Sequence, residues 1–364
     1  MTTEDNQRII DSLIEQGKSF AIWRIPGEDV VHFRMQSSGS PCLIYNIEDL
    51  NKRSGFVIAP FRVCKEHPIV LIQPDCFSLP EFTEEKAYIR KKKEFLPEEI
   101  QNSSERNEKE RYAQCFSIFS QTLHKGDLDK LVLSRNRTID KKDEFSPGAM
   151  YYAAVKRYIR SYIYLCHTPA TGTWIGSTPE ILLAGNNGQW QTVALAGTQP
   201  IQNEEIPQKW DDKNWREQQL VAFYIRHQLA SLNIRPHENG PYAIRAGEVS
   251  HLKSDFNFSL PDSNKLGNVL ALLHPTPAVC GLPKKEAYQF ILKNEGYDRS
   301  YYSGFIGWLE PQGRTDLYVN LRCMHIEEKA LTLYAGGGLL ASSALEDEWQ
   351  ETQDKMQTMQ RLLK

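Results

Sequence analysis

The stretch DLYVNLRCMHIEEKALTLYAGGGLL, residues 316–340, predicts a β-hairpin, and EDEWQETQDKM, residues 346–356, then predicts a helix. The hairpin segment is rich in β-branched and aromatic residues on both sides of a charged turn. Strands that follow one another directly, without a helix between them, pair antiparallel. This end of the chain therefore indicates an α+β fold with mainly antiparallel sheets.

The rest of the chain also places strands in consecutive runs. Short aromatic and β-branched segments occupy residues 18–95, while residues 96–111 are so rich in charge that they predict a surface loop or hinge. Helices are predicted at residues 5–17, from near 105 to Gly126, at 146–161, at 206–233 and from just after Pro283 to Gly296. No repeat and no obvious Pro/Gly linker divides the chain, so we expect one interwoven domain, residues 1–364.

The composition excludes several classes of protein. The 364 residues are 40% hydrophobic and 24% charged, with a net charge of −3, so the basic excess of a non-specific nucleic-acid binder is missing. Seven cysteines occur without CxxC or Cys/His spacing, which indicates reduced thiols in a cytoplasmic protein. The sequence also lacks a signal-peptide pattern, an apolar run long enough for a membrane span, and a nucleotide-phosphate loop motif. We expect a cytoplasmic protein that binds neither nucleic acid nor membrane, with a monomer as the default.

The helix near the end of the chain places two like charges beside an apolar stripe. Glu348, Glu351 and Lys355 fall at i, i+3 and i+7, on one narrow face. The neighbouring stripe includes Trp349 and Met356 and should pack on a core. Two carboxylates at the edge of a buried face need a partner of opposite charge.

The predicted helix at 206–233 repeats this pattern, because Glu217 lies in a stripe with Val221 and Tyr224. The simpler interpretation is a salt bridge to Lys213, four residues earlier. Glu348 and Glu351 on the other helix favour a second interpretation. Three carboxylates on two helices suit a hard cation such as Mg²⁺, which takes one or two protein carboxylates together with water and an anionic substrate.

Two further side chains are candidates for proton transfer. Lys130 opens the strand KLVLSR, and a lysine that points inward there is desolvated and can act as a base. The alternative is a surface lysine whose stem lies along the strand. Glu180, in GSTPEILLAG, is a candidate proton donor, and the alternative is a charge that protects a strand edge.

Two small-residue segments are candidates for holding an anion. The glycines of YAGGGLL, residues 334–340, allow the backbone to approach a ligand, although a tight turn or bulge also explains them. The segment HPTPAVCGLPK, residues 274–284, precedes a helix and could form a pocket wall, or it could be a buried connecting loop.

Together these segments resemble the chorismate-utilising enzymes, the family of isochorismate, salicylate, anthranilate and aminodeoxychorismate synthases. The resemblance runs from about Lys130 to Lys355 and is carried, in the family's order, by KLVLSR, GSTPEILL, LAGT, KNWREQQLV, HPTPAVCGLP, YYSGFIG, NLRC, YAGGGLL and EDEWQETQDK. It implies two large, mainly antiparallel sheets flanked by helices, with a chorismate site between two lobes. Residues 106–364 are then the catalytic part, and residues 1–105 match only loosely.

The resemblance also implies roles for individual residues. It implies dependence on Mg²⁺, with Glu217 and Glu351 as principal ligands and Glu348 close by, acting through water. Lys130 is similar to the lysine that activates water, and Glu180 to the general acid. The residues implied to bind the substrate are Gly197, Thr198, His274, Ala278, Tyr302, Arg322, Gly336, Gly338 and Lys355.

Three positions distinguish the subfamilies. Lys130 is similar to the base of the water-using enzymes, and ammonia-using relatives lack it. Ala196 stands where aminodeoxychorismate synthases have a nucleophilic lysine, and Ala278 stands where salicylate and anthranilate synthases typically have threonine. The resemblance therefore implies an isochorismate synthase, an isomerase without a glutaminase partner, whose product feeds menaquinone or siderophore synthesis. The alternatives are a salicylate synthase, an anthranilate-type subunit that uses ammonia, and a chorismate-binding relative without turnover.

The sequence departs from the family pattern at three positions. Asn214 stands where many relatives have an acidic residue, and Gln218 replaces a frequent histidine. Gly337 is often alanine in the family. These departures could change the affinity for the metal, but they leave the implied ligands intact.

Overall fold

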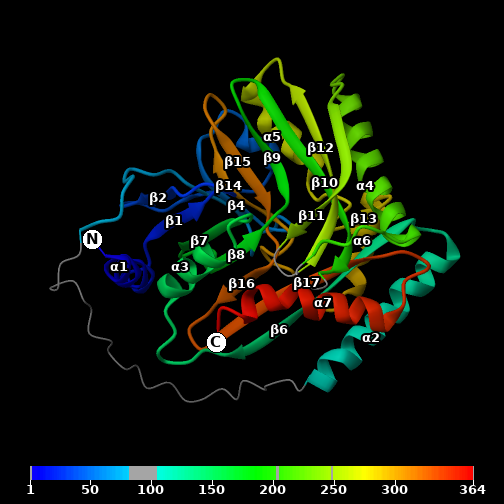
Figure 1. The fold of residues 1–364 in the computed structure, drawn as a ribbon. Helices are drawn as coiled ribbons and strands as arrows, with labels where there is room; N and C mark the ends of the chain where they lie inside the picture. The colour runs from blue at the N-terminus through cyan, green and yellow to red at the C-terminus, as the bar shows by residue number, and fades with distance from the viewer. Residues whose placement is uncertain (1, 82–104, 202–204, 247–248, 364) are drawn as a thin grey trace.

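A computed structural model describes residues 2–81, 105–201, 205–246 and 249–363 (Figure 1). It contains two sheets with helices on their outer faces. Every pairing between neighbouring strands is antiparallel, as the sequence predicts. Most of the loop or hinge predicted at 96–111 lies outside the described residues.

The first sheet has eight strands. In spatial order they are β13 (Gly281–Leu282), β6 (Lys130–Asp140), β17 (Ala330–Leu339), β16 (Cys323–Ile326), β8 (Gly172–Thr178), β7 (Tyr162–Thr168), β1 (Ser19–Arg24) and β2 (Val31–Gln36). The second sheet has nine strands. In spatial order they are β11 (His237–Ala246), β12 (Val249–Ser259), β10 (Gln189–Pro200), β9 (Ile181–Asn186), β15 (Thr315–Val319), β14 (Phe305–Leu309), β4 (Gly55–Ala59), β5 (Ile69–Ile72) and β3 (Cys42–Ile44).

The two sheets pack face to face, and both faces of their central strands are buried. In β7, Tyr162 and Tyr164 belong to the core between the sheets, whereas Ile163 and Leu165 face the helices on the outer side. Successive side chains of a strand point to opposite faces, so a strand buried on both faces is apolar throughout. This explains the aromatic and aliphatic runs in the sequence.

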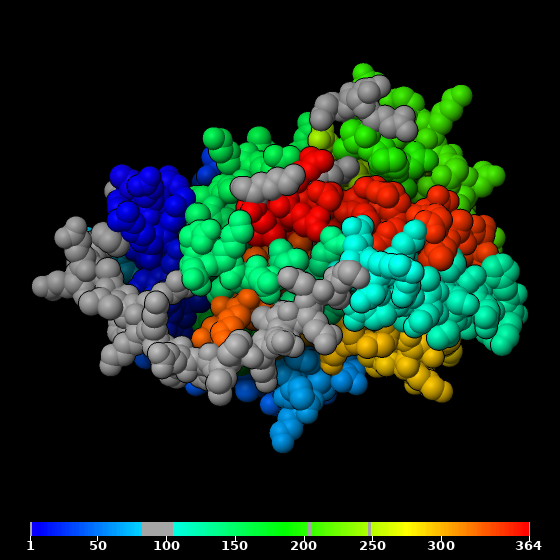
Figure 2. Space-filling view, turned by 90° about the horizontal axis from the view of Figure 1, so that it is seen from below, coloured from blue at the N-terminus to red at the C-terminus, as the bar shows by residue number. Residues whose placement is uncertain are grey.

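The helices cover the outer faces of the sheets and one end of the molecule. They are α1 (Thr3–Glu15), α2 (Glu105–Lys125), α3 (Pro147–Arg157), α4 (Asp212–Ser231), α5 (Leu266–Leu273), α6 (Lys284–Asn294) and α7 (Leu345–Gln360). The buried faces of α4 and α5 pack on the nine-stranded sheet, and those of α1 and α3 pack on the eight-stranded sheet. Figure 2 shows α2 and α7 side by side on one face of the molecule. None of the helices described is both long and apolar enough to cross a membrane.

The segment 316–340 differs from the predicted hairpin. Its first strand, β15, belongs to the nine-stranded sheet, and only β16 and β17 form a hairpin in the other sheet. The chain crosses between the sheets at residues 320–322, where Asn320 donates to the carbonyl of Tyr301 at 2.8 Å. Arg322 adopts the left-handed region, with φ of 47°. This crossover brings the ends of both sheets, and Arg322, to one place.

One predicted helix differs in detail from the structure, and one helix was missed. Helix α4 begins at Asp212, not near 206, because the side chain of Asp211 accepts from the backbone N–H of Asn214 and caps the helix. Helix α5 was not predicted, because the apolar run LGNVLALL is too short to distinguish a helix from a strand.

Candidate active site

A narrow cavity lies where the two sheets, α4 and α7 meet. Ten of the residues that the resemblance implies line it: Glu180, Gly197, Thr198, Glu217, Ala278, Tyr302, Arg322, Gly336, Gly338 and Lys355. A wider hollow of about 1210 Å³ adjoins it at Thr198, and Glu348 and Glu351 line that hollow. Twelve of the implied residues therefore line these two neighbouring hollows, which share Thr198.

His274 lies elsewhere. Its buried ring contacts the carbonyl oxygen of Pro60 at 3.2 Å and faces a separate groove beside α5 and α6. Thr276, two residues further along, contacts Glu180 instead, since its hydroxyl donates to Oε1 of Glu180 at 3.3 Å. The structure therefore does not bring His274 together with the other implied residues.

Lys130 and Glu217 form an ion pair beside the cavity. The Lys130 side chain is fully buried, and its Nζ lies 3.0 Å from Oε1 of Glu217. The approach is not aligned as a hydrogen bond, and Nζ has no hydrogen-bond partner among the described residues. A Cβ at Gly338 would lie 2.1 Å from Oε1 of Glu217, so only glycine fits against this pair.

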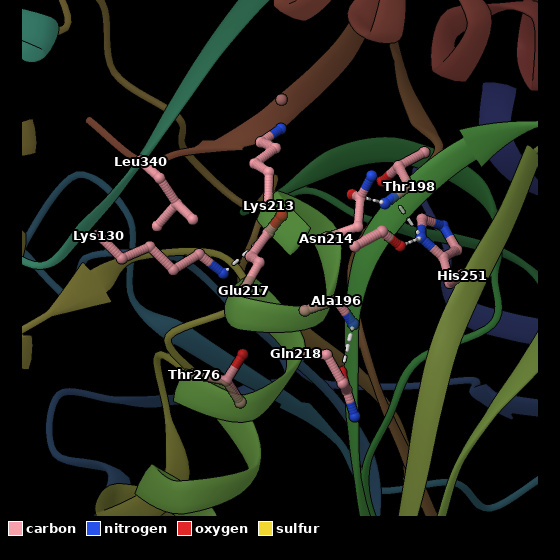
Figure 3. Close-up of polar contacts among 12 residues, drawn as sticks. Lys130, Ala196, Thr198, Lys213, Asn214, Glu217, Gln218, His251, Thr276 and Leu340 are labelled. Carbon is pink, nitrogen blue, oxygen red and sulfur yellow. Dashed lines mark hydrogen bonds and ion pairs between the residues drawn. The ribbon is translucent and has the colours of Figure 1, made fainter. Parts of the chain in front are cut away.

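The simpler interpretation of Glu217, a salt bridge to Lys213, is wrong. Lys213 pairs with Glu348 of α7 at 2.6 Å. Glu217 pairs with Lys130 of β6 instead (Figure 3). Lys355 pairs with Glu351 at 2.5 Å and also donates to the carbonyl of Gly336. Each of the three carboxylates therefore has its own lysine.

The carboxyl groups of α7 differ in protonation behaviour. Burial, and then the neighbouring charge of Glu351, raise the pKa of Glu348 to about 7. Burial acts in the same direction on Glu351, but the charges of Lys355 and Lys213 outweigh it and lower the pKa of Glu351. Glu351 is therefore the better anion of the two.

Glu180 has the environment of a proton donor. It lies between β8 and β9 and is buried. Burial raises its pKa to about 7, against the opposing charge of Lys130 and the hydrogen bond from Thr276. A carboxylic acid that is half protonated near neutral pH can give up a proton to a leaving group.

His251 is a member of the cavity that the sequence did not reveal. Burial, and then the charge of Arg322, hold its pKa well below the ordinary value, so the ring is neutral. Nδ1 lies 3.0 Å from the carbonyl oxygen of Gly197 and must carry the proton, so Nε2 accepts from Nη2 of Arg322 at 2.6 Å. His251 thereby fixes the direction of the Arg322 guanidinium. A lone histidine in a strand has no local pattern that would have identified it.

Two departures from the family pattern hold β10 against α4 (Figure 3). Asn214 accepts from the backbone N–H of Thr198 at 2.8 Å, and Gln218 accepts from that of Ala196 at 3.1 Å. Gln218 also donates to the carbonyl of Ala194 at 3.2 Å. These two amide side chains are uncharged, and they form hydrogen bonds with backbone groups beside the cavity.

The three carboxylates offer the oxygen ligands that a hard cation prefers. Within the described ranges, no three His, Cys, Asp or Glu side chains converge as a metal site. However, Oε2 of Glu348 is buried and has no hydrogen-bond partner among the described residues. A Cβ at Gly337 would lie 3.0 Å from that oxygen and 3.1 Å from Oε1 of Glu351, so both oxygens face the same glycine. A small hard cation fits this donor set.

Comparison with known proteins agrees with these observations. The family model described as "Chorismate binding enzyme" matches residues 77–364. Isochorismate synthase MenF of Escherichia coli K12 is 33% identical over 266 residues, covering 69% of this chain and 60% of the relative. Isochorismate synthase DhbC of Bacillus subtilis 168 is 30% identical over 257 residues, covering 65% and 64%. The chain thus spans less than two thirds of the length of these relatives.

Solved structures share the fold. The menaquinone-specific isochorismate synthase MenF of Escherichia coli matches with a TM-score of 0.78 and 24% identity, over 98% of this chain and 91% of that one. Anthranilate synthase component I of Streptococcus pneumoniae TIGR4 matches with a TM-score of 0.65 and 17% identity, over 93% and 89%. The α+β fold with two large antiparallel sheets flanked by helices is confirmed.

Proposed function

The chain belongs to the family of chorismate-binding enzymes, and from that premise we propose that it is an isochorismate synthase that converts chorismate to isochorismate. The observation that carries the proposal is the buried Lys130 next to a cavity that holds the acid Glu180. Lys130 is the residue that distinguishes water-using from ammonia-using members in the resemblance. The names of the curated relatives MenF and DhbC support the same activity.

In the proposed reaction, water adds a new hydroxyl group at one ring carbon, and the substrate's own hydroxyl group leaves from another. Lys130, as the general base, takes a proton from water, and the resulting hydroxyl bonds to C2 of the ring. The ring double bonds shift, the bond from C4 to its hydroxyl breaks, and protonated Glu180 gives that oxygen its proton. One water enters and one leaves, so the net change is an isomerisation. Each proton transfer contributes about 10²–10⁴-fold to the rate.

The substrate carboxylates require cationic and N–H donors. Arg322, fixed by His251, and Lys355 supply positive charge at the cavity. Gly336 and Gly338 bring the backbone of β17 against the same space, and Tyr302 lies on its wall. Arg322 stays charged at neutral pH, although burial lowers its pKa to about 10.

We propose Mg²⁺ as the cofactor, with Glu217 and Glu351 as ligands and Glu348 close by. When bound, Mg²⁺ would neutralise a substrate carboxylate and orient it. The unpartnered oxygen of Glu348 and the crowding of Glu348 against Glu351 support this assignment. Lys213 and Lys355 occupy these carboxylates here, so binding of the cation requires the lysines to release them.

The runner-up is a salicylate synthase, which would carry the same water chemistry on through loss of pyruvate. Ala278 argues against it, because its methyl group lines the cavity where a threonine hydroxyl is typical of the pyruvate-releasing relatives. An anthranilate-type subunit that uses ammonia shares the fold, and Lys130 argues against it. A relative that binds chorismate without turnover would have no use for Glu180 and Lys130 together.

The test is product analysis by chromatography after incubation with chorismate, with Mg²⁺ and with EDTA. We expect isochorismate that requires Mg²⁺ and no stoichiometric pyruvate. Salicylate with pyruvate would replace the proposal by its runner-up, and anthranilate from added ammonia would select the third alternative. Stabilisation by chorismate without any product would identify the binding relative.

The proposal extends to the surroundings of the enzyme. We propose a cytoplasmic monomer that needs no glutaminase partner, in which residues 106–364 form the catalytic part of a single domain. Its product would feed menaquinone or siderophore synthesis, and the likeness to the menaquinone-specific enzyme MenF supports the first of these.

A further inference from the structure

The hydrogen-bond partners along one edge of strand β6 change at Val132, from backbone groups to side chains. Up to this point the edge pairs with backbone: Lys130 and Leu131 lie opposite β13, and the N–H of Val132 donates to the carbonyl of Cys280 at 2.8 Å. Beyond it, side chains take over. Nη2 of Arg299 donates to the carbonyl of Val132 at 2.9 Å, and the N–H of Ser134 donates to a carboxylate oxygen of Glu295 at 2.7 Å.

Glu295 and Arg299 therefore complete the hydrogen-bond ladder that a further strand would supply. They pair with each other through two hydrogen bonds of 2.6 Å, one from Nε and one from Nη2. Their side chains are 1% and 2% exposed, so no solvent competes for these bonds. A planar guanidinium bonded to both carboxylate oxygens is held in one orientation.

The same guanidinium reaches the wall of the cavity. Nη1 of Arg299 donates to the carbonyl of Val279 at 2.7 Å. Val279, Ala278 and Val132 all line the cavity, and Lys130 lies two residues before Val132 on the same face of β6. One side chain thus fixes the strand of the proposed base to the neighbouring loop, which forms another part of the cavity wall.

A buried ion pair is a weak source of stability, because removing two charges from water offsets most of their attraction. Its hydrogen bonds are directional, however, and two discrete backbone carbonyls receive them here. Small errors of position at a reacting centre are costly, since a shift of about 1 Å can lower a rate by about 10²-fold. The pair is therefore better suited to setting a geometry than to holding the fold together.

We propose that Glu295 and Arg299 are a positioning pair: without touching the substrate, they set the distance between Lys130 and the wall at residues 278–279. The inference rests on the proposed function, because it assigns Lys130 as the group being positioned. Ser134 belongs to the same unit, since its hydroxyl also donates to Glu295, at 2.8 Å.

The test is Arg299→Lys, which keeps the charge but has too few donors in the right directions to bond Glu295, Val132 and Val279 together. We expect kcat for chorismate consumption to fall by about 10–10²-fold, while KM changes by less than about threefold. A purely structural role would lower the melting temperature without moving kcat of the folded enzyme.

The matched control is Arg24→Lys. Arg24 is also buried, and its guanidinium donates to the carbonyls of Tyr158, Ile159 and Ser161, but it lies on β1, away from the cavity. We expect a comparable loss of thermal stability with wild-type kcat. If Arg299→Lys does not fold, Glu295→Asp decides, because its shorter side chain keeps the charge but draws back from Ser134. A wild-type kcat in the folded Glu295 or Arg299 variant overturns the proposal.

The assay follows consumption of chorismate, so it separates this inference from the proposed function. A wild-type enzyme that turns chorismate into another product would refute the isochorismate assignment, yet a low kcat in the variants would still support the positioning pair. A wild-type enzyme that consumes no chorismate would overturn both, because there would be no reaction to position.

Discussion

Two buried ion pairs that contact or include residues of strand β6 differ in how fully their polar atoms are bonded. In Glu295–Arg299, both carboxylate oxygens accept from the guanidinium, whose other donors bond to two backbone carbonyls. In Glu217–Lys130, the two charges lie 3.0 Å apart without an aligned hydrogen bond. A fully bonded pair fixes the structure around it, whereas an incompletely bonded pair can exchange its partner for water or a substrate. The difference distinguishes the proposed positioning pair from the pair that contains the proposed base, although both pairs are buried.

The largest effect is expected from breaking the incompletely bonded pair. Lys130→Ala removes the proposed base, so turnover should fall by at least about 10²–10⁴-fold. Glu217 loses its only described ion partner, so the melting temperature should be measured beside the rate. A folded Lys130→Ala enzyme with near-normal turnover of chorismate would show that Lys130 is not the base.

The next effect concerns the cation. Glu351→Gln removes a proposed ligand charge, so the Mg²⁺ concentration for half-maximal activity should rise by about 10–100-fold or more, since loss even of an outer partner costs that much. Glu346→Gln on the same helix is the control, because Glu346 is exposed and pairs with Lys109 at the surface. Mg²⁺-induced thermal stabilisation should be weakened in the first variant and kept in the second. An unchanged Mg²⁺ titration in Glu351→Gln would remove it from the ligand set.

A smaller effect is expected from pH, because the turnover rate should depend on the protonation of Glu180. Burial raises its pKa to about 7, so the protonated form, which can donate a proton, predominates below pH 7 and is lost above it. We expect kcat to fall by about tenfold per pH unit once the pH exceeds the pKa of Glu180 in the enzyme–substrate complex. In Glu180→Gln, the remaining kcat should no longer fall with rising pH in this way. A kcat that stays constant between pH 6 and pH 9 would argue against Glu180 as the acid.

The sequence could predict the class of fold and most of the residues that line the cavity, because these depend on local patterns and on residues in recognisable segments. It could not predict which strands share a sheet. Strands β15 and β16 are both apolar, and only the packed structure shows that the chain crosses between sheets at Asn320. The pairing of Lys213 was wrong for the same reason, since helix periodicity detects neighbours four residues apart but not Glu348 on another helix. Likewise, nothing local marks Arg299 as the partner of Val132, 167 residues earlier.

The smallest effect is expected at the wall that Arg299 holds. Ala278→Thr adds one hydroxyl and one methyl group to a residue that lines the cavity, next to the fixed carbonyl of Val279. If the threonine of pyruvate-releasing relatives contributes to the second step, this variant should release measurable pyruvate while still forming isochorismate. A single polar group in a pocket typically changes a barrier by about 1–3 kcal/mol, so pyruvate should remain the minor product. Ala278→Ser is the matched control for the hydroxyl alone, and an absence of pyruvate from both variants would mean that the choice of product lies outside this side chain.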